Sequence, residues 1–265
     1  MQTSKKYSDE SRLNIDGAMV YADSKEAVDE LFPSWRSQRS KYSLSMMCSI
    51  NRAKMEYWSA HRGEILVNRQ GELANHSGGE NGLYFVETTD TWVEYRWEFI
   101  SYALEKLQLD AVVFEEPDLL LPYFYSDAFK AEWKTYYGTA WEDPISSTDA
   151  MFKCARLRVH MMDRFLTEMA NRIHEVNPDI KVYLACHSTP SYTAIAVTAG
   201  INTYMASGAL DGLIGQTWTD TSSVKLLQNG ESFVNEYMAS FIGYASYVDV
   251  AGDLPLYTLT DPMGD

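Results

Sequence analysis

Two adjacent carboxylates, Glu115 and Glu116, stand between an apolar run and Pro117. The run, Leu-Asp-Ala-Val-Val-Phe at 109–114, is typical of a strand in a buried parallel sheet. A carboxyl group buried at a strand end holds its proton more tightly and can donate it near neutral pH. In an extended strand the two side chains point to opposite sides, so we expect one to enter a site and the other to pair with a loop arginine or to cap a backbone group. The alternative is a pair of surface or capping carboxylates.

Polar and aromatic residues also follow the other apolar runs. The runs at 13–21, 42–50, 181–187, 210–218 and 254–260 alternate with helical patterns, which predicts a parallel sheet built from βα units. The residues at or after the ends of these runs that could do chemistry are Asn51, Arg52, His187, Gln216, Trp218, Asp220 and Asp261.

The pattern favours a barrel over a doubly wound sheet. Neither GxGxxG nor GxxxxGK[ST] occurs, whereas barrel active sites are built from residues at the carboxyl ends of the strands. We therefore expect an α/β fold of the (β/α)8 TIM-barrel type in one domain, residues 1–265. Only six strands are visible, and the chain stops at Asp265 directly after one of them. Either two strands hide in the loop-rich regions or, as we favour, the chain is part of a longer protein and its barrel, with six to seven strands, is incomplete.

The helices that must position the strands are also visible. Apolar spacing predicts a helix over 24–39, with Pro33 as a break or kink, and one over 90–109 with Asp90 as its N-cap. The remaining predicted helices cover 127–137, 148–176, 192–207 and 232–250. Between 51 and 90 the sequence is polar and glycine-rich, with one strand-like piece at 64–67, and long loops of this kind are usually functional.

Composition excludes several function classes. The chain has 22 basic and 37 acidic side chains, a net charge of −15, which opposes binding to nucleic acid or to anionic membranes. No apolar run reaches the length of about 18 residues that a membrane span needs. Cys48, Cys154 and Cys186 form no zinc-binding spacing and are expected to be packed thiols, so we predict no metal and no cofactor.

Two segments carry a resemblance to a known group of enzymes. Asp-Ala-Val-Val-Phe-Glu-Glu-Pro at 110–117, followed by Ala-Phe-Lys-Ala-Glu-Trp at 128–133 and Tyr-Tyr-Gly at 136–138, resembles the acid/base segment of clan-A barrel glycoside hydrolases. The similarity is greatest to the β-galactosidase-like members and to bacterial glycosidases, in which the fourth strand ends in Asn-Glu.

The resemblance implies a role for individual residues. Glu116 matches the acid/base glutamate, and Glu115 stands where the clan has asparagine, which leaves the assignment between the two glutamates open. If they close the fourth strand, one strand lies before residue 13 and the strand ending at Thr260 is the seventh. Asp261 then matches the position of the second carboxylate that glycoside cleavage needs, although an aspartate there could equally cap the next helix.

A carbohydrate substrate would also need binding groups. The candidates are Asn51, Arg52, Tyr123, His187, Gln216 and Trp218, in which aromatic rings would stack on sugar faces and polar groups would bond hydroxyls. We therefore expect a retaining glycoside hydrolase, with a noncatalytic carbohydrate-binding or scaffold barrel as the alternative. A lyase or aldolase would need a lysine at the end of a strand, and none of the predicted strands ends in lysine. As written the chain is expected to be cytoplasmic, or secreted or periplasmic if a leader was removed, and no pattern indicates its oligomeric state.

Overall fold

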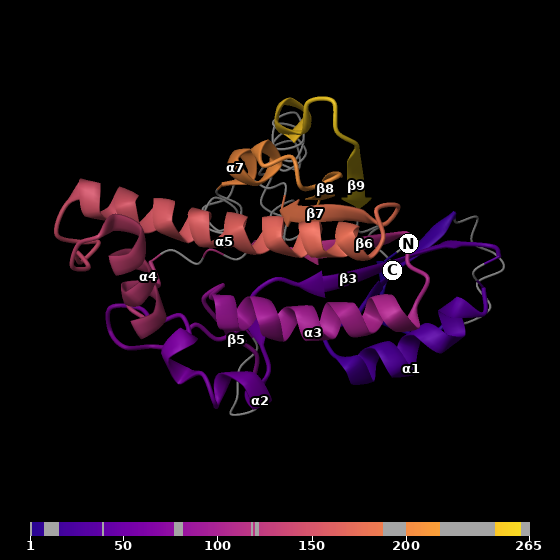
Figure 1. Ribbon diagram of the computed structural model, residues 1–265, viewed down its shortest axis with the longest axis horizontal. Coiled ribbons are helices and arrows are strands. Elements are labelled where there is room, and N and C mark those ends of the chain that lie inside the picture. The colour runs from indigo at the N-terminus through magenta and orange to yellow at the C-terminus, as the bar shows by residue number, and fades with distance from the viewer. Residues whose placement is uncertain are drawn as a thin grey trace, which may run out of the picture.

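The computed structural model describes residues 2–7, 16–38, 40–76, 82–117, 119, 122–187, 200–217 and 247–260. Its main element is a sheet of seven parallel strands (Figure 1). In spatial order they are β1 (Gln2–Thr3), β2 (Gly17–Tyr21), β3 (Ser43–Ser49), β6 (Ala111–Glu115), β7 (Lys181–His187), β8 (Gly212–Thr217) and β9 (Leu256–Thr260).

The strands lie side by side in the order in which they occur along the chain. A doubly wound sheet would reverse its order at a switch point, whereas a (β/α) barrel adds each strand next to the previous one. The seven strands curl into a half-barrel, so the expected incomplete (β/α)8 barrel is confirmed. The count of six strands was wrong, because β1 has only two residues and no apolar run. Its position before residue 13 makes β6 the fourth strand and β9 the seventh, as the resemblance implied.

Helices flank the sheet on one side (Figure 1). They are α1 (Lys25–Arg36), α3 (Asp90–Lys106), α5 (Thr148–Val176) and α7 (Ile201–Ala206), and α4 (Asp127–Tyr137) lies beside the first part of α5. The 127–137 and 148–176 predictions are confirmed to the residue. In each, a serine side chain accepts a hydrogen bond at the N-terminus: Ser126 from Phe129 N, and Ser147 from Ala150 N.

Two predicted helix features differ from the structure. Pro33 does not break α1, which continues from Lys25 to Arg36 with Phe32 and Trp35 buried in the core. Thr89 rather than Asp90 is the N-cap of α3, because its side chain accepts from Trp92 N at 3.1 Å. The predicted helix 232–250 and the first part of 192–207 lie largely outside the described residues.

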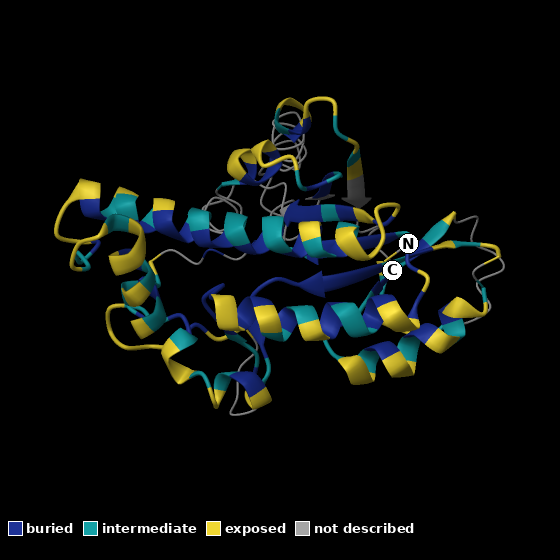
Figure 2. Cartoon of the chain, viewed as in Figure 1, coloured by how far each residue is buried: buried dark blue, intermediate teal, exposed yellow. Residues whose placement is uncertain are grey.

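The two faces of the sheet have different cores. Alternate strand residues such as Met46, Val112 and Leu184 pack against the helices in the large core, and Figure 2 shows the sheet-facing sides of α3 and α5 buried. The intervening residues form a smaller cluster on the inner face of the half-barrel, with Met47, Val113, Ala185 and Ile214 at its centre.

The excursion between β3 and α3 contains short elements. These are β4 (Arg52–Ala53), α2 (Met55–Trp58), the 3-10 turn η1 (Arg62–Glu64) and β5 (Tyr84–Phe85), and β4 pairs antiparallel with β5. The predicted strand at 64–67 was wrong: Ile65 and Val67 make only isolated bridges, to Val86 and Leu73.

Helix α4 and the first half of α5 extend past the carboxyl ends of the strands (Figure 1). We call this part, residues 127–161, the arm. The arm has a separate apolar cluster that includes Phe129, Trp133, Cys154 and Met161. None of the described helices combines the length and the apolar character that crossing a membrane requires.

Candidate active site at the carboxyl end of the half-barrel

Glu115 and Glu116 lie at the carboxyl end of β6, the fourth strand. Glu115 is two residues beyond Val113, and the strand alternation therefore places it on the inner face of the half-barrel. Glu116 follows the strand with a φ of 50° and is the one non-glycine residue of the described chain with a positive φ. Its amide donates to Ala185 O at 2.9 Å, so the backbone is tied to β7 at this point. Strained backbone of this kind persists where surrounding contacts hold it, and it is concentrated at functional sites.

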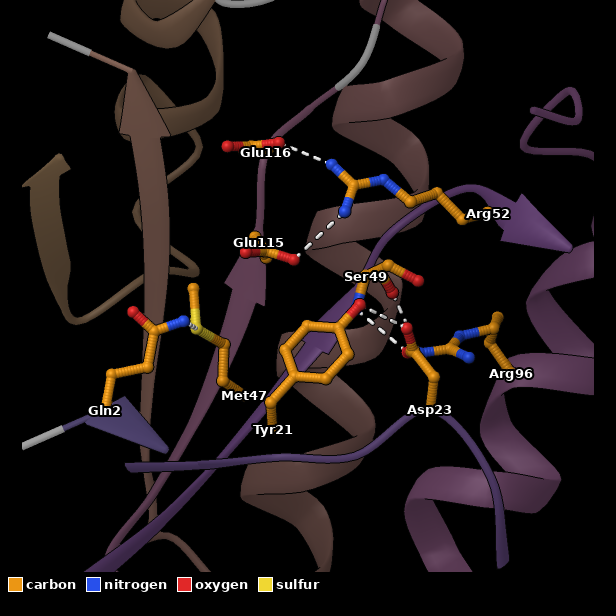
Figure 3. A network of polar contacts seen from close by, with 9 residues as sticks. All are labelled: Gln2, Tyr21, Asp23, Met47, Ser49, Arg52, Arg96, Glu115 and Glu116. Atoms are coloured by element: carbon orange, nitrogen blue, oxygen red, sulfur yellow. Dashed lines mark hydrogen bonds and ion pairs between the residues drawn. The ribbon is translucent and has the colours of Figure 1, made fainter. Parts of the chain in front are cut away.

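Arg52 is the cation that both glutamates contact (Figure 3). It follows β3 in the excursion, where it pairs in register with Phe85. Its guanidinium donates to Glu115 Oε2 at 3.1 Å through one nitrogen and to Glu116 Oε2 through another. The side chains of Arg52, Glu115 and Glu116 are only 8%, 12% and 9% exposed. The three side chains therefore form a nearly buried cluster in which two carboxylates contact one guanidinium.

The expected divergence of the two glutamates was wrong. An extended strand would send them to opposite faces, but the strand ends at Glu115 and the left-handed conformation of Glu116 redirects the chain. Both carboxylates consequently reach the same guanidinium. The expected pairing of one glutamate with a loop arginine is confirmed, and it extends to both.

A second polar network lies beside this cluster, at the ends of β2 and β3 (Figure 3). Asp23 accepts from Tyr21 Oη at 2.5 Å, from Ser49 N at 2.9 Å and from Arg96 of α3 at 3.0 Å. Arg96 also donates to Ser49 O at 2.8 Å and is 2% exposed. The network fixes the ends of two neighbouring strands relative to α3.

The electrostatics of the network follow from these contacts. Burial acts to raise the pKa of Asp23, but Arg96, Tyr21 and Ser49 outweigh it, and the pKa lies below its ordinary value. Burial, Asp23 and Glu115 all raise the pKa of Tyr21, so its hydroxyl stays protonated and donates. Glu115 acts on Tyr21 because the two networks lie next to each other (Figure 3).

Sequence reasoning missed Tyr21, Asp23 and Arg96. A signal for the first two was present, because Tyr-Ala-Asp ends the first apolar run as the other polar residues end theirs. Arg96 stands within the apolar stripe of α3, between Trp92 and Ile100, and a charge in such a stripe indicates a buried ionic partner.

His76 lies at the rim of the site and was also left out. It is exposed, but its ring packs against the Phe85 ring in an edge-to-face arrangement, with 5.5 Å between the ring centroids. The Phe85 ring centroid is in turn 6.0 Å from the Arg52 guanidinium. Partial burial and Arg52 lower the pKa of His76, while Glu116 and Asp23 oppose the shift. A neutral imidazole at this position can both donate and accept hydrogen bonds.

The other predicted site residues divide into three groups. Asn51 is buried beside Arg52, and its carbonyl accepts from Val86 N at 2.9 Å. Tyr123 is half-buried and packs against Phe85 and its neighbours under the excursion. His187 ends β7, and its register partner Gln216 is the residue before the end of β8. The side chains of both lie outside the described part, as do Trp218, Asp220 and Asp261 entirely.

The three cysteines are free and buried, as expected. Burial raises the pKa of the Cys48 thiol to about 12, which makes it a packing group rather than a nucleophile. In the portion of the chain that the structure describes, no group of three His, Cys, Asp or Glu residues is placed to hold a metal ion.

Comparison with known proteins identifies the fold. No protein-family model and no curated protein matches the sequence. Two β-galactosidases, from the Antarctic haloarchaeon Halorubrum lacusprofundi and from the psychrophilic Marinomonas ef1, each superpose with a TM-score of 0.52. The first is 9% identical over 77% of this chain, and the second is 8% identical over 76%. This chain spans only 36% of each of those proteins. At such identities the similarity shows the barrel fold that these glycoside hydrolases have, and not a specific family.

Proposed function

We propose that this protein is a glycoside hydrolase, with Glu116 as the general acid and base. The observation that carries the proposal is the nearly buried pair of glutamates at the carboxyl end of the fourth strand, held by Arg52 and by a strained backbone. Barrel enzymes build their active sites at this end of the strands. The barrel fold shared with two β-galactosidases supports the reaction class.

The charge count of the cluster suits proton transfer. Arg52 contributes one positive charge and the glutamates up to two negative ones to this nearly buried place. Two carboxylates that lie this close to one another repel when both are ionised, and such pairs are common where an enzyme transfers a proton. The pair can therefore supply a proton to a glycosidic oxygen while Arg52 keeps the other carboxylate in place.

A second carboxylate completes the mechanism. We propose Asp261, which follows β9, the seventh strand, as the group that attacks the anomeric carbon, and Glu115 as the residue that shares Arg52 with the acid. Retention requires about 5–5.5 Å between the two reacting carboxyl groups, and inversion about 6.5–9.5 Å. The substrate would be bound by Asn51, Arg52, Tyr123, His187, Gln216 and Trp218.

A noncatalytic carbohydrate-binding barrel is the second candidate, and the same ion pairs favour it. Charge-assisted hydrogen bonds from Arg52 stabilise the ionised form of both carboxylates, and an acid that never holds a proton cannot protonate a leaving group. Activity and binding must therefore be measured separately.

The test uses aryl α- and β-glycosides with two leaving groups, a nitrophenolate that needs protonation and a dinitrophenolate that does not. We expect Glu116→Gln to lose about 10²- to 10⁴-fold in kcat/KM with the first and far less with the second, since only departure of the first needs the general acid. Glu115→Gln should show no such dependence on the leaving group. Glu105→Gln, an exposed glutamate at the far end of α3, is the matched control.

The outcomes separate the candidates. A leaving-group effect in Glu115→Gln instead would assign the acid to Glu115. A folded parent that hydrolyses none of the glycosides, yet gives chemical-shift changes at the site when sugars are added, would contradict the enzyme and support the binding barrel. NMR of the first-formed anomer decides between retention and inversion.

A further inference from the structure

A buried ion pair lies behind the glutamate site, outside the groups discussed so far. Glu87, two residues beyond β5, and Arg158 of α5 are 1% and 2% exposed, and their side chains meet at 2.9 Å. Removing two charges from water costs several kcal/mol per ion, so a buried pair by itself is weak evidence of a contribution to stability. The other contacts of Glu87 and Arg158 indicate what the pair does.

Arg158 holds the segment that leaves Glu116. Its guanidinium donates to Leu119 O at 2.6 Å and to Tyr123 O at 2.6 Å, in addition to Glu87. The cation also lies 5.3 Å from the Phe124 ring centroid and 5.0 Å from that of Phe129. One planar guanidinium thus serves two backbone carbonyls and a carboxylate, which an ammonium group could not do with the same geometry.

Glu87 holds the other end of the same segment. Its Oε1 accepts from Ser126 Oγ at 2.7 Å, and Ser126 is the N-cap of α4. Burial raises the pKa of Glu87, against the opposing effects of Arg158 and Ser126. Leu119, Tyr123 and Ser126 are therefore all held by one ion pair.

The segment begins at Glu116, whose positive φ is costly for a residue with a side chain. Such a conformation costs about 1–3 kcal/mol and persists only when the surrounding structure determines it. The amide of Glu116 is held by Ala185 O on the strand side. On the other side, the first contact that ties the chain down is the one between Leu119 O and Arg158, three residues later among the residues that the structure describes.

We propose that Glu87 and Arg158 are positioning residues, which hold Leu119, Tyr123 and Ser126 so that the Glu116 carboxylate, three residues before Leu119, stays in its working position. The kinetic test of this inference rests on the proposed glycosidase function. The structural test, an NMR titration, is independent of that function.

The kinetic test compares Arg158→Lys with Arg172→Lys. Arg172 is on the same helix and pairs with Glu94 and Glu168, so its substitution controls for the loss of a helix-borne arginine ion pair. With all proteins folded at the assay temperature, we expect Arg158→Lys to lower kcat at least tenfold while KM changes less than threefold. Glu87→Gln, which keeps an acceptor oxygen for Arg158 and Ser126, should retain most of the activity, whereas Glu87→Ala should not. Parent-like kcat in Arg158→Lys or in Glu87→Ala would overturn the proposal.

The structural test follows the NMR titration of His76, whose pKa depends on the Glu116 charge. Displacement of Glu116 in Arg158→Lys should lower the His76 pKa, as we also expect for Glu116→Gln. If the parent hydrolyses no glycoside, the proposed function fails but this titration still decides the inference. A His76 titration unchanged in Arg158→Lys contradicts it. Should Arg158→Lys not fold, Glu87→Asp, which shortens the acid by one methylene, is judged by the same two criteria.

Discussion

Replacing Arg52 with methionine should destabilise the protein strongly, because two nearly buried carboxylates lose the cation they share. At the 3.1 Å of the Glu115 contact and an effective dielectric constant of about 20, one ion pair is worth about 5 kcal/mol before desolvation. Removing one partner of a buried pair costs about 3–5 kcal/mol in practice. We therefore expect Arg52→Met to lower the free energy of unfolding by about 3–5 kcal/mol at pH 7.

Urea unfolding of three variants tests this reasoning. Arg156→Met, at an exposed position of α5, should change the free energy of unfolding by no more than about 0.5 kcal/mol. Adding Glu115→Gln and Glu116→Gln to Arg52→Met should recover part of the loss, since the two carboxylates that Arg52 contacts are then replaced by neutral amides. The loss of unfolding free energy in Arg52→Met should also be smaller near pH 5, because a proton on one of the carboxylates can then compensate for the missing guanidinium. A cost below about 1 kcal/mol for Arg52→Met, or no recovery in the triple variant, would refute the electrostatic account of the site.

Three further outcomes follow from the geometry. Glu116→Gln should lower the pKa of His76 in an NMR titration, because the Glu116 charge acts to raise it, and an unchanged value would mean that the two are not neighbours. The pKa of Asp23 lies below its ordinary 3.8, so its stabilisation is present above that pH and is lost as pH falls through the lower folded value. Asp23→Asn should therefore flatten the loss of unfolding free energy below about pH 4, and an identical acid profile would exclude this contribution. Gly212→Ala would place a Cβ 2.5 Å from Pro255 O, and we expect a cost of about 1–3 kcal/mol in thermal unfolding; an unchanged Tm would show that β9 can move away.

The long amphipathic elements could be predicted from the sequence because their signals are local. Helices α4 and α5 each have a serine N-cap, and α4 ends at Gly138 in a left-handed conformation. Strand β7 is a continuous apolar run between a turn and a polar residue. Strand β1 could not be predicted in place, since Gln2 and Thr3 belong to the sheet only through pairing with Met19 and Val20 of β2.

The site could be predicted in part. A pair of carboxylates after an apolar run pointed to β6, and Arg52 was among the candidate residues. The meeting of both glutamates at one guanidinium depends on a single backbone angle at Glu116, which no local pattern of residues encodes. The contact between Asp23 and Arg96 joins residues 73 positions apart, and such partners are selected by the folded barrel rather than by neighbouring sequence.

Helix α5 packs in two separate apolar cores, and this division determines where insertions and deletions could be tolerated. Its 29 residues span about 43 Å, whereas the seven residues of β7 span about 23 Å, so the helix overhangs the sheet. The fully buried Cys154, Leu157 and Met161 pack within the arm, whereas Met162 and the buried side chains after it pack on the sheet. Insertions or deletions in the arm would therefore change the chain beyond the carboxyl ends of the strands while the contacts between α5 and the sheet are preserved. Arg158 lies where the two cores meet, so such changes would have to keep its contacts.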